Sequence, residues 1–81
     1  MIQQNITDKE ETLAQTVRRV RRSARLTQVQ LATLAGVGPR FIHDLEAGKS
    51  SIRLDTLERV LGVLGLRLRA LPAVTPVGTQ Q

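Results

Sequence analysis

Apolar residues recur at helical spacing along most of the chain. The first set comprises Leu13, Val17, Val20 and Ala24. At about 100° per residue these positions lie within a sector of about 60°, the stripe of a helix that packs on a core. Thr7 or Asp8 can cap such a helix, so we expect it to begin there.

Two short helices joined by a glycine turn are predicted next. Thr27 begins a T-x-x-Q capping box, and the helix that follows it ends at Gly36. Pro39 suits the first position of another helix, which we expect to run to about Ala47 and to stop at Gly48. This layout is typical of the motif that places its second helix in the major groove of DNA.

The pattern changes towards the C-terminus. A further helix is expected over residues 54–64, although Gly62 weakens its interior. In residues 66–71 apolar and basic positions then alternate, as in a half-buried strand. We therefore expect an all-α domain of four to five helices over residues 7–65, a strand over 66–71, and flexible ends at 1–6 and 72–81.

Composition narrows the class of protein. The chain has 81 residues and lacks cysteine, which excludes disulfides and thiolate metal sites. No apolar run is long enough to span a membrane, and the first residues do not have the layout of a signal peptide, so we expect a cytoplasmic protein. Because so short a chain buries a small core, dimerisation is a reasonable expectation.

The net charge of +5 favours a polyanionic partner. Residues 18–53 carry eight basic side chains against only Asp44 and Glu46. The positive charge is therefore concentrated on the predicted pair of short helices and on the helix before it.

The helix over residues 39–47 has a polar outer face. With Ile42 and Leu45 directed inward, Arg40, His43 and Asp44 are directed outward. An arginine can pair with guanine O6 and N7, a histidine can donate to a base or a phosphate, and Asp44 could accept from cytosine N4 or hold Arg40 in position. Phe41 is expected to pack at the flank of the core, with contact to a thymine methyl as the alternative.

Other basic and polar side chains suit the phosphate backbone, where they supply affinity without reading bases. These candidates are Gln28, Arg18, Arg22, Arg25, Lys49 and Arg53. Gln28 could also brace the start of the helix at Pro39. For the arginines of the first helix, an ordinary solvated face is the alternative.

The residues carry a family resemblance. The segments L-T-Q-x-x-L-A-x-x-A-G-V (Leu26 to Val37), I-x-x-L-E-x-G-K (Ile42 to Lys49) and L-x-x-L (Leu54 to Leu57) resemble the lambda-repressor-like helix-turn-helix of the Xre and Cro/C1 class. The tract R-F-I-H-D-L-E-A-G-K, with the later L-G-L-R-L-R, is most similar to HipB-like antitoxins of type II toxin-antitoxin operons.

This resemblance implies roles for individual residues. It implies a structural ion pair between Arg21 and Glu46, both of which the helical pattern also places at the edge of the core. It assigns the family's base-reading positions to Pro39, Arg40, His43 and Asp44. Gly38 departs from the serine or threonine cap that is common in the family, and Pro39 cannot donate a side-chain hydrogen bond, so the bases that are read stay open.

The resemblance also implies partners. HipB-like proteins dimerise partly through a C-terminal strand, which corresponds here to residues 66–71 with Leu66, Leu68 and Ala70 on its apolar side; a strand within the fold is the alternative. The resemblance further implies autorepression of the operon and a HipA-like serine/threonine kinase toxin. A dimer with two recognition helices predicts a palindromic DNA operator. The competing interpretations are a phage-type or stand-alone Xre-family regulator, and a protein that mainly neutralises a partner.

Catalysis and metal binding are not expected. His43 is the only histidine, and no suitably spaced carboxylates or cysteines accompany it. The chain has no nucleophile with an adjacent base, and it has no glycine-rich loop of the kind that binds phosphates. We therefore predict a binding protein, associated with the nucleoid, without cofactor.

Overall fold

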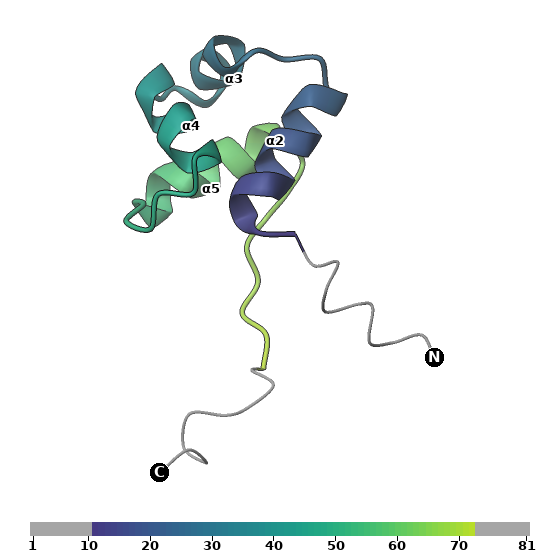
Figure 1. Ribbon diagram of the computed structural model, residues 1–81, viewed down its shortest axis with the longest axis vertical. Coiled ribbons are helices and arrows are strands. Elements are labelled where there is room, and N and C mark those ends of the chain that lie inside the picture. Colours follow the sequence, from purple (N-terminus) through teal and green to yellow (C-terminus); the bar gives the residue numbers. More distant parts are fainter. Residues whose placement is uncertain (1–10, 73–81) are drawn as a thin grey trace.

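The computed structural model describes residues 11–72, which contain four helices and no strand. The helices are α2 (Leu13–Ser23), α3 (Gln28–Ala35), α4 (Pro39–Glu46) and α5 (Leu54–Val63). α3 packs against α4 and α5, and α2 packs against α4 (Figure 1). The expected all-α fold is confirmed. None of the helices in residues 11–72 has the length and apolar character that crossing a membrane requires.

The start of α2 differs from the prediction. Thr12 is extended and caps the helix, and its hydroxyl accepts a hydrogen bond from the Gln15 amide while the Gln15 side chain accepts one from the Thr12 amide. The predicted start near Thr7 or Asp8 is therefore wrong for this helix, and both of those residues lie outside the described part of the chain. Thr12 to Gln15 form a T-x-x-Q box, identical in pattern to that at Thr27.

The helix-turn-helix pair forms as predicted. Thr27 and Gln30 complete the reciprocal capping box at the start of α3. Gly36 ends this helix with φ +70°, a left-handed conformation that costs a residue with a Cβ about 1–2 kcal/mol. The Val37 amide then donates to the Ala32 carbonyl, and Pro39 starts α4 two residues later. The chain thus reverses within a few residues.

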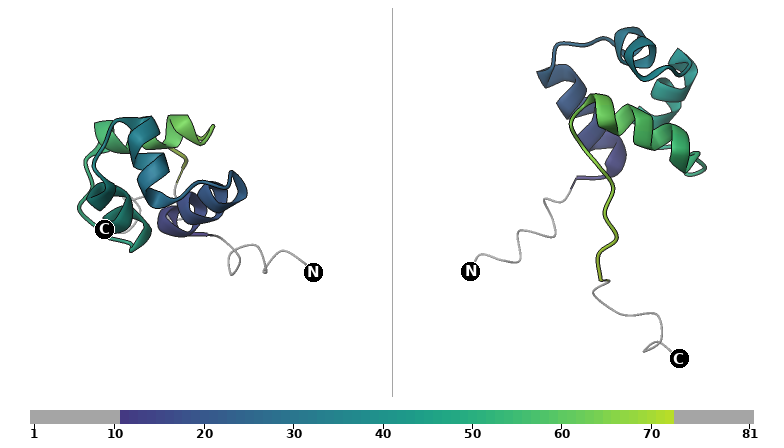
Figure 2. Two further views of the ribbon diagram at one scale, coloured as in Figure 1. Left: turned by 90° about the horizontal axis from the view of Figure 1, so that it is seen from above. Right: turned by 180° about the vertical axis from the view of Figure 1, so that it is seen from behind.

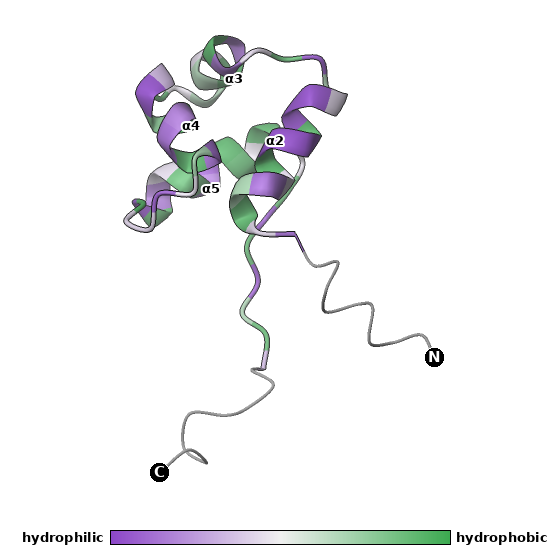
Figure 3. Ribbon diagram, in the orientation of Figure 1, coloured by the Kyte–Doolittle hydropathy of each residue, from purple (hydrophilic) through white to green (hydrophobic). Residues whose placement is uncertain are grey.

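One face of each helix supplies the core. The buried apolar side chains are Val17, Leu31, Ala32, Ala35, Ile42, Leu45, Leu57, Val60 and Leu61. Of the stripe predicted for the first helix, only Val17 is fully buried. Val20 is half-buried, Leu13 lies at the helix start and Ala24 follows the helix end. Figure 3 shows the hydrophilic residues along much of α2, so this helix presents a polar outer face.

Residues 66–72 have no helix or strand. They run past α2 and away from the helices, as Figure 1 and the right-hand view of Figure 2 show. Leu66 packs against the core of its own chain, whereas Leu68 is 38% exposed and Ala70 is exposed. Leu66 thus contacts the core of its own chain, and pairing of residues 66–71 with a strand of a second chain stays a prediction.

Candidate nucleic-acid interface

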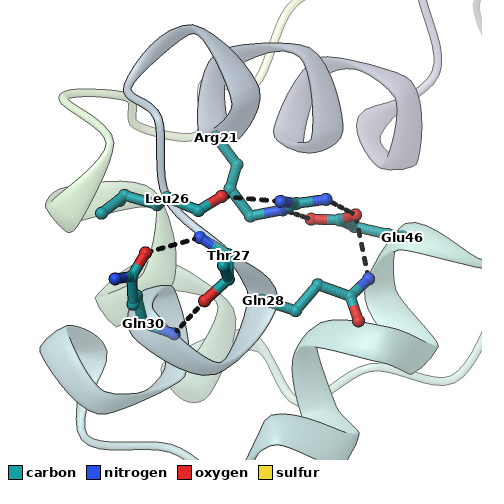
Figure 4. Close-up of polar contacts among 6 residues, drawn as sticks. All are labelled: Arg21, Leu26, Thr27, Gln28, Gln30 and Glu46. Carbon is teal, nitrogen blue, oxygen red and sulfur yellow. Dashed lines mark hydrogen bonds and ion pairs between the residues drawn. The ribbon is translucent and has the colours of Figure 1, made fainter.

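A buried ion pair holds α2 and α4 together. The Arg21 guanidinium donates two hydrogen bonds to the Glu46 carboxylate, at 2.6 and 2.9 Å, and a third to the Leu26 carbonyl at 2.7 Å (Figure 4). Only 10% of the Arg21 side chain and 4% of the Glu46 side chain are exposed. The pair that the sequence suggested is therefore present, and it also fixes the turn between α2 and α3 through Leu26.

Gln28 extends this network to α3. Its Nε2 donates to Glu46 Oε1 at 3.1 Å (Figure 4). Burial acts to raise the pKa of Glu46, but the hydrogen bonds from Arg21 and Gln28 outweigh it and hold this pKa below its usual value. The expectation that Gln28 braces the start of α4 is wrong, because its partner Glu46 is the last residue of that helix.

A groove lies where α2, α3 and α4 meet. It has a volume of about 410 Å³, and its polar lining consists of Arg18, Arg21, Arg22, Gln28, His43 and Glu46. From the sequence we predicted phosphate contacts, an ion pair and a base contact for different members of this set, and the fold brings all of them to one surface. Because Arg21 neutralises Glu46, the groove is left with a positive charge from Arg18 and Arg22.

The outer face of α4 carries a second polar cluster. Asp44 Oδ1 accepts from Arg40 Nε at 3.1 Å and lies 3.6 Å from His43 Nδ1, while Lys49 Nζ lies 3.7 Å from the other Asp44 oxygen. Partial desolvation acts to raise the pKa of Asp44. The hydrogen bond from Arg40 and the neighbouring cations outweigh this effect, so the pKa lies below its usual value. Asp44 is thus a carboxylate enclosed by cations, which reduces its repulsion of nearby DNA phosphates.

Arg40 is positioned to contact a ligand. Its side chain is 85% exposed, and its bond to Asp44 uses only Nε. The two terminal nitrogens of the guanidinium stay available, and they form the fork that recognises guanine. Pro39 occupies the first position of α4, and no side chain caps that helix at Gly38. Pro39 has no backbone N–H, and the Phe41 N–H donates to the Gly38 carbonyl at 3.0 Å, so the first turn of α4 leaves few N–H groups for an acceptor.

Three of the six predicted phosphate contacts do not line the groove, namely Arg25, Lys49 and Arg53. Arg25 occupies the turn between α2 and α3 with φ +62°. Arg53 precedes α5 and donates to the Asp55 carboxylate at 2.8 and 3.2 Å. Because Asp55 already binds its guanidinium, Arg53 is a weaker candidate for a phosphate contact. A count of charges along the sequence does not reveal this pairing.

Residues 17–71, more than half of the chain, match the sequence profile of the helix-turn-helix family HTH_3. The chain belongs to this helix-turn-helix family. It is a member of the Xre, lambda-repressor-like type, as its resemblance indicated. The family match includes α2 from Val17 onward, the three other helices and residues 66–71.

Two relatives of this helix-turn-helix chain bear the names of regulators. The immunity repressor protein of Bacillus phage phi105 is 37% identical over 60 residues, which are 74% of this chain and 42% of that protein. The chain thus spans less than half of the phage repressor. An uncharacterised HTH-type transcriptional regulator, y4mF, of Sinorhizobium fredii is 47% identical over 55 residues, which are 68% of this chain and 72% of that protein.

Solved structures share the helix-turn-helix fold. A chain in the structure of a HipA-HipB-O2-O3 complex is 26% identical with a TM-score of 0.67, covering 83% of this chain and 97% of that one. A toxin-antitoxin module from Streptococcus pneumoniae gives 28% identity and a TM-score of 0.61, covering 89% of this chain and 81% of that one. A chain named MDT Protein gives 26% identity and a TM-score of 0.68, covering 80% and 96%.

Proposed function

We propose that the protein is a sequence-specific transcriptional repressor that binds double-stranded DNA. The observation that carries this proposal is the exposed face of α4, where Asp44 holds Arg40 by one nitrogen and leaves its fork free. Next to it, the groove with Arg18 and Arg22 supplies the positive charge that a phosphate backbone requires. Arg40 reads bases, and the phosphate contacts of Arg18 and Arg22 fix the orientation of α4 in the major groove of DNA.

The repressor binds a palindromic operator as a homodimer. Two copies of α4 then reach half-sites about 34 Å apart on one face of the duplex. The exposed apolar residues Leu68 and Leu71, on a segment that leaves the helical body, support contact between two chains. Such a repressor acts on chromosomal DNA in the cytoplasm.

We further assign the protein to the antitoxins of HipBA-like operons, which repress their own promoter and bind a HipA-like kinase toxin. Support comes from the likeness to a chain of the HipA-HipB-O2-O3 complex over nearly all of that chain's length. The alternative is a phage-type or stand-alone Xre-family regulator without a toxin. The identity to a phage immunity repressor favours that alternative. Co-purification of the tagged protein with the product of the neighbouring gene separates the two.

The DNA-binding proposal is tested by titrating the full chain against a duplex from upstream of its own coding sequence. A random-sequence duplex of equal length is the reference, and each is measured at several salt concentrations. We expect tighter binding to the upstream duplex. The logarithm of the affinity should fall linearly with the logarithm of the salt concentration, with a slope of about −0.9 for each phosphate contacted. Equal affinity for both duplexes, or affinity independent of salt, would contradict the proposal.

A further inference from the structure

The groove between α2 and α4 has a cationic side supplied by α2. Arg18 and Arg22 are exposed, and in residues 11–72 neither forms an ion pair with a carboxylate. The Glu46 carboxylate that also lines the groove is already bound by Arg21. A small anion that enters the groove therefore meets two arginines and no free carboxylate among the described residues.

Gln28 adds a neutral donor from α3. A side-chain amide nitrogen carries two hydrogens, and the bond to Glu46 Oε1 uses one of them. The second hydrogen is available to an oxygen acceptor in the groove. Because the Glu46 bond fixes the amide, this donor is held in place before any ligand binds.

His43 completes the groove from α4. Its side chain is 66% exposed, and its Nδ1 lies 3.6 Å from Asp44 Oδ1. When the neutral ring carries its proton on Nδ1, beside the Asp44 carboxylate, the other nitrogen, Nε2, is an acceptor, and it becomes a donor only in the protonated ring. A protonated His43 would thus bridge Asp44 and an anion in the groove.

Without a bound anion, some of the charged groups around His43 favour a positive charge on its ring and others disfavour it. On α2, Arg18 and Arg22 disfavour a further positive charge, and Arg21 offsets Glu46. On α4, Asp44 favours a positive imidazole but is shared with Arg40, and with Lys49 of the following loop. A phosphate in the groove adds negative charge beside all of these cations, so it favours the protonated ring.

We propose that this groove binds a backbone phosphate of the DNA with His43 in its protonated form, so that DNA binding takes up a proton. The inference rests on the proposed function and adds a regulation to it, namely affinity that rises as the pH falls. Histidine is the side chain whose charge ordinarily changes between about pH 5 and 8, so the effect falls in a physiological range.

The test measures affinity by fluorescence anisotropy on the upstream duplex at about pH 6 and about pH 8, over a series of salt concentrations. For the wild-type chain we expect affinity to rise by up to about tenfold per chain for each unit of falling pH. We also expect the slope of log affinity against log salt to be steeper at the lower pH, by up to about 0.9 per chain, since one more cation contacts the DNA backbone.

Variants of His43 test whether this side chain causes the pH dependence of DNA affinity. His43→Gln keeps a hydrogen-bond donor but cannot gain charge, so both pH effects should vanish and affinity should stay at the weaker level. His43→Lys is charged throughout, so affinity should be independent of pH at the tighter level. Arg22→Gln is the matched control, which should lower affinity at every pH while keeping the pH dependence.

Three results would overturn the inference. One is an equal affinity of the wild-type chain at both pH values. Another is an unchanged pH dependence in His43→Gln. The third is a pH dependence whose salt slope does not change, which would place His43 on a base edge instead of a phosphate. Absence of any preference for the upstream duplex at every pH would instead contradict the proposed function itself.

Discussion

Replacing Arg21 by methionine is expected to destabilise the domain strongly. Methionine fills much of the space of the arginine stem but leaves the Glu46 carboxylate, 4% exposed, without its cation. It also removes the donor to the Leu26 carbonyl. Breaking a buried pair by removing one partner costs about 3–5 kcal/mol. Domains are stable by only about 5–15 kcal/mol, with small ones at the lower end, so the loss is a large fraction of the total.

The assay is urea unfolding followed by far-UV circular dichroism, since the chain lacks tryptophan and tyrosine. Arg21→Met should lower the unfolding midpoint sharply, whereas Arg59→Met, which changes an exposed arginine of α5, should change stability by less than about 0.5 kcal/mol. In the double variant Arg21→Met with Glu46→Leu, most of the stability should return, because no uncompensated charge remains buried. All chains are compared at one concentration, since dimerisation affects apparent stability.

Two outcomes would refute this reasoning. If Arg21→Met unfolds at the same urea concentration as the wild-type chain, the ion pair does not stabilise the packing of α2 on α4. If the double variant is no more stable than the single one, the loss comes from the missing Leu26 contact and not from the stranded carboxylate. A double-mutant cycle over Arg21 and Glu46 separates these contributions.

Three further outcomes are expected from unfolding measurements on variants. Gly36→Ala should lower the free energy of unfolding by about 1–2 kcal/mol because φ is +70°. Gly62→Ala lies within α5 with open space at the new Cβ, so it should raise the free energy of unfolding by about 0.5–1 kcal/mol. Equal effects of the two variants would contradict the left-handed conformation of Gly36. Thr27→Ala should cost about 0.5–2 kcal/mol through loss of the cap, and Thr27→Ser should restore most of it. Because the pKa of Glu46 is lowered from 4.5 in the folded state, its contribution to stability should be complete above about that pH and decline as the pH falls further, and Glu46→Gln should flatten this decline in acid unfolding curves.

Local signals predicted much of the fold. The T-x-x-Q box at Thr27, the left-handed glycine at Gly36 and the proline at the first position of α4 act within a few residues, so the sequence alone indicates them. The same kind of signal at Thr12 would have corrected the start of α2. Residues 66–71 show the limit of periodicity, because alternation indicates a strand without naming the segment that pairs with it.

The candidate site was predicted in part. Outward positions on α4 follow from helical spacing, so Arg40, His43 and Asp44 were correctly placed on its surface. The bond from Gln28 to Glu46 could not be foreseen, because it depends on how α3 lies relative to α4. The same holds for the groove, whose lining comes from three helices and exists only once their packing is fixed.

The most direct test of sequence reading by α4 is the specificity ratio of Arg40→Ala. This ratio is the affinity for the upstream duplex divided by that for the random-sequence duplex, measured beside the wild-type chain and Arg59→Ala. A bidentate guanine contact is worth about 1–3 kcal/mol, so on its loss the ratio should fall about 5- to 150-fold, while affinity for random DNA falls by a smaller factor through the loss of one positive charge. A ratio unchanged in Arg40→Ala, or lowered equally in Arg59→Ala, would contradict the assignment of this surface to base recognition.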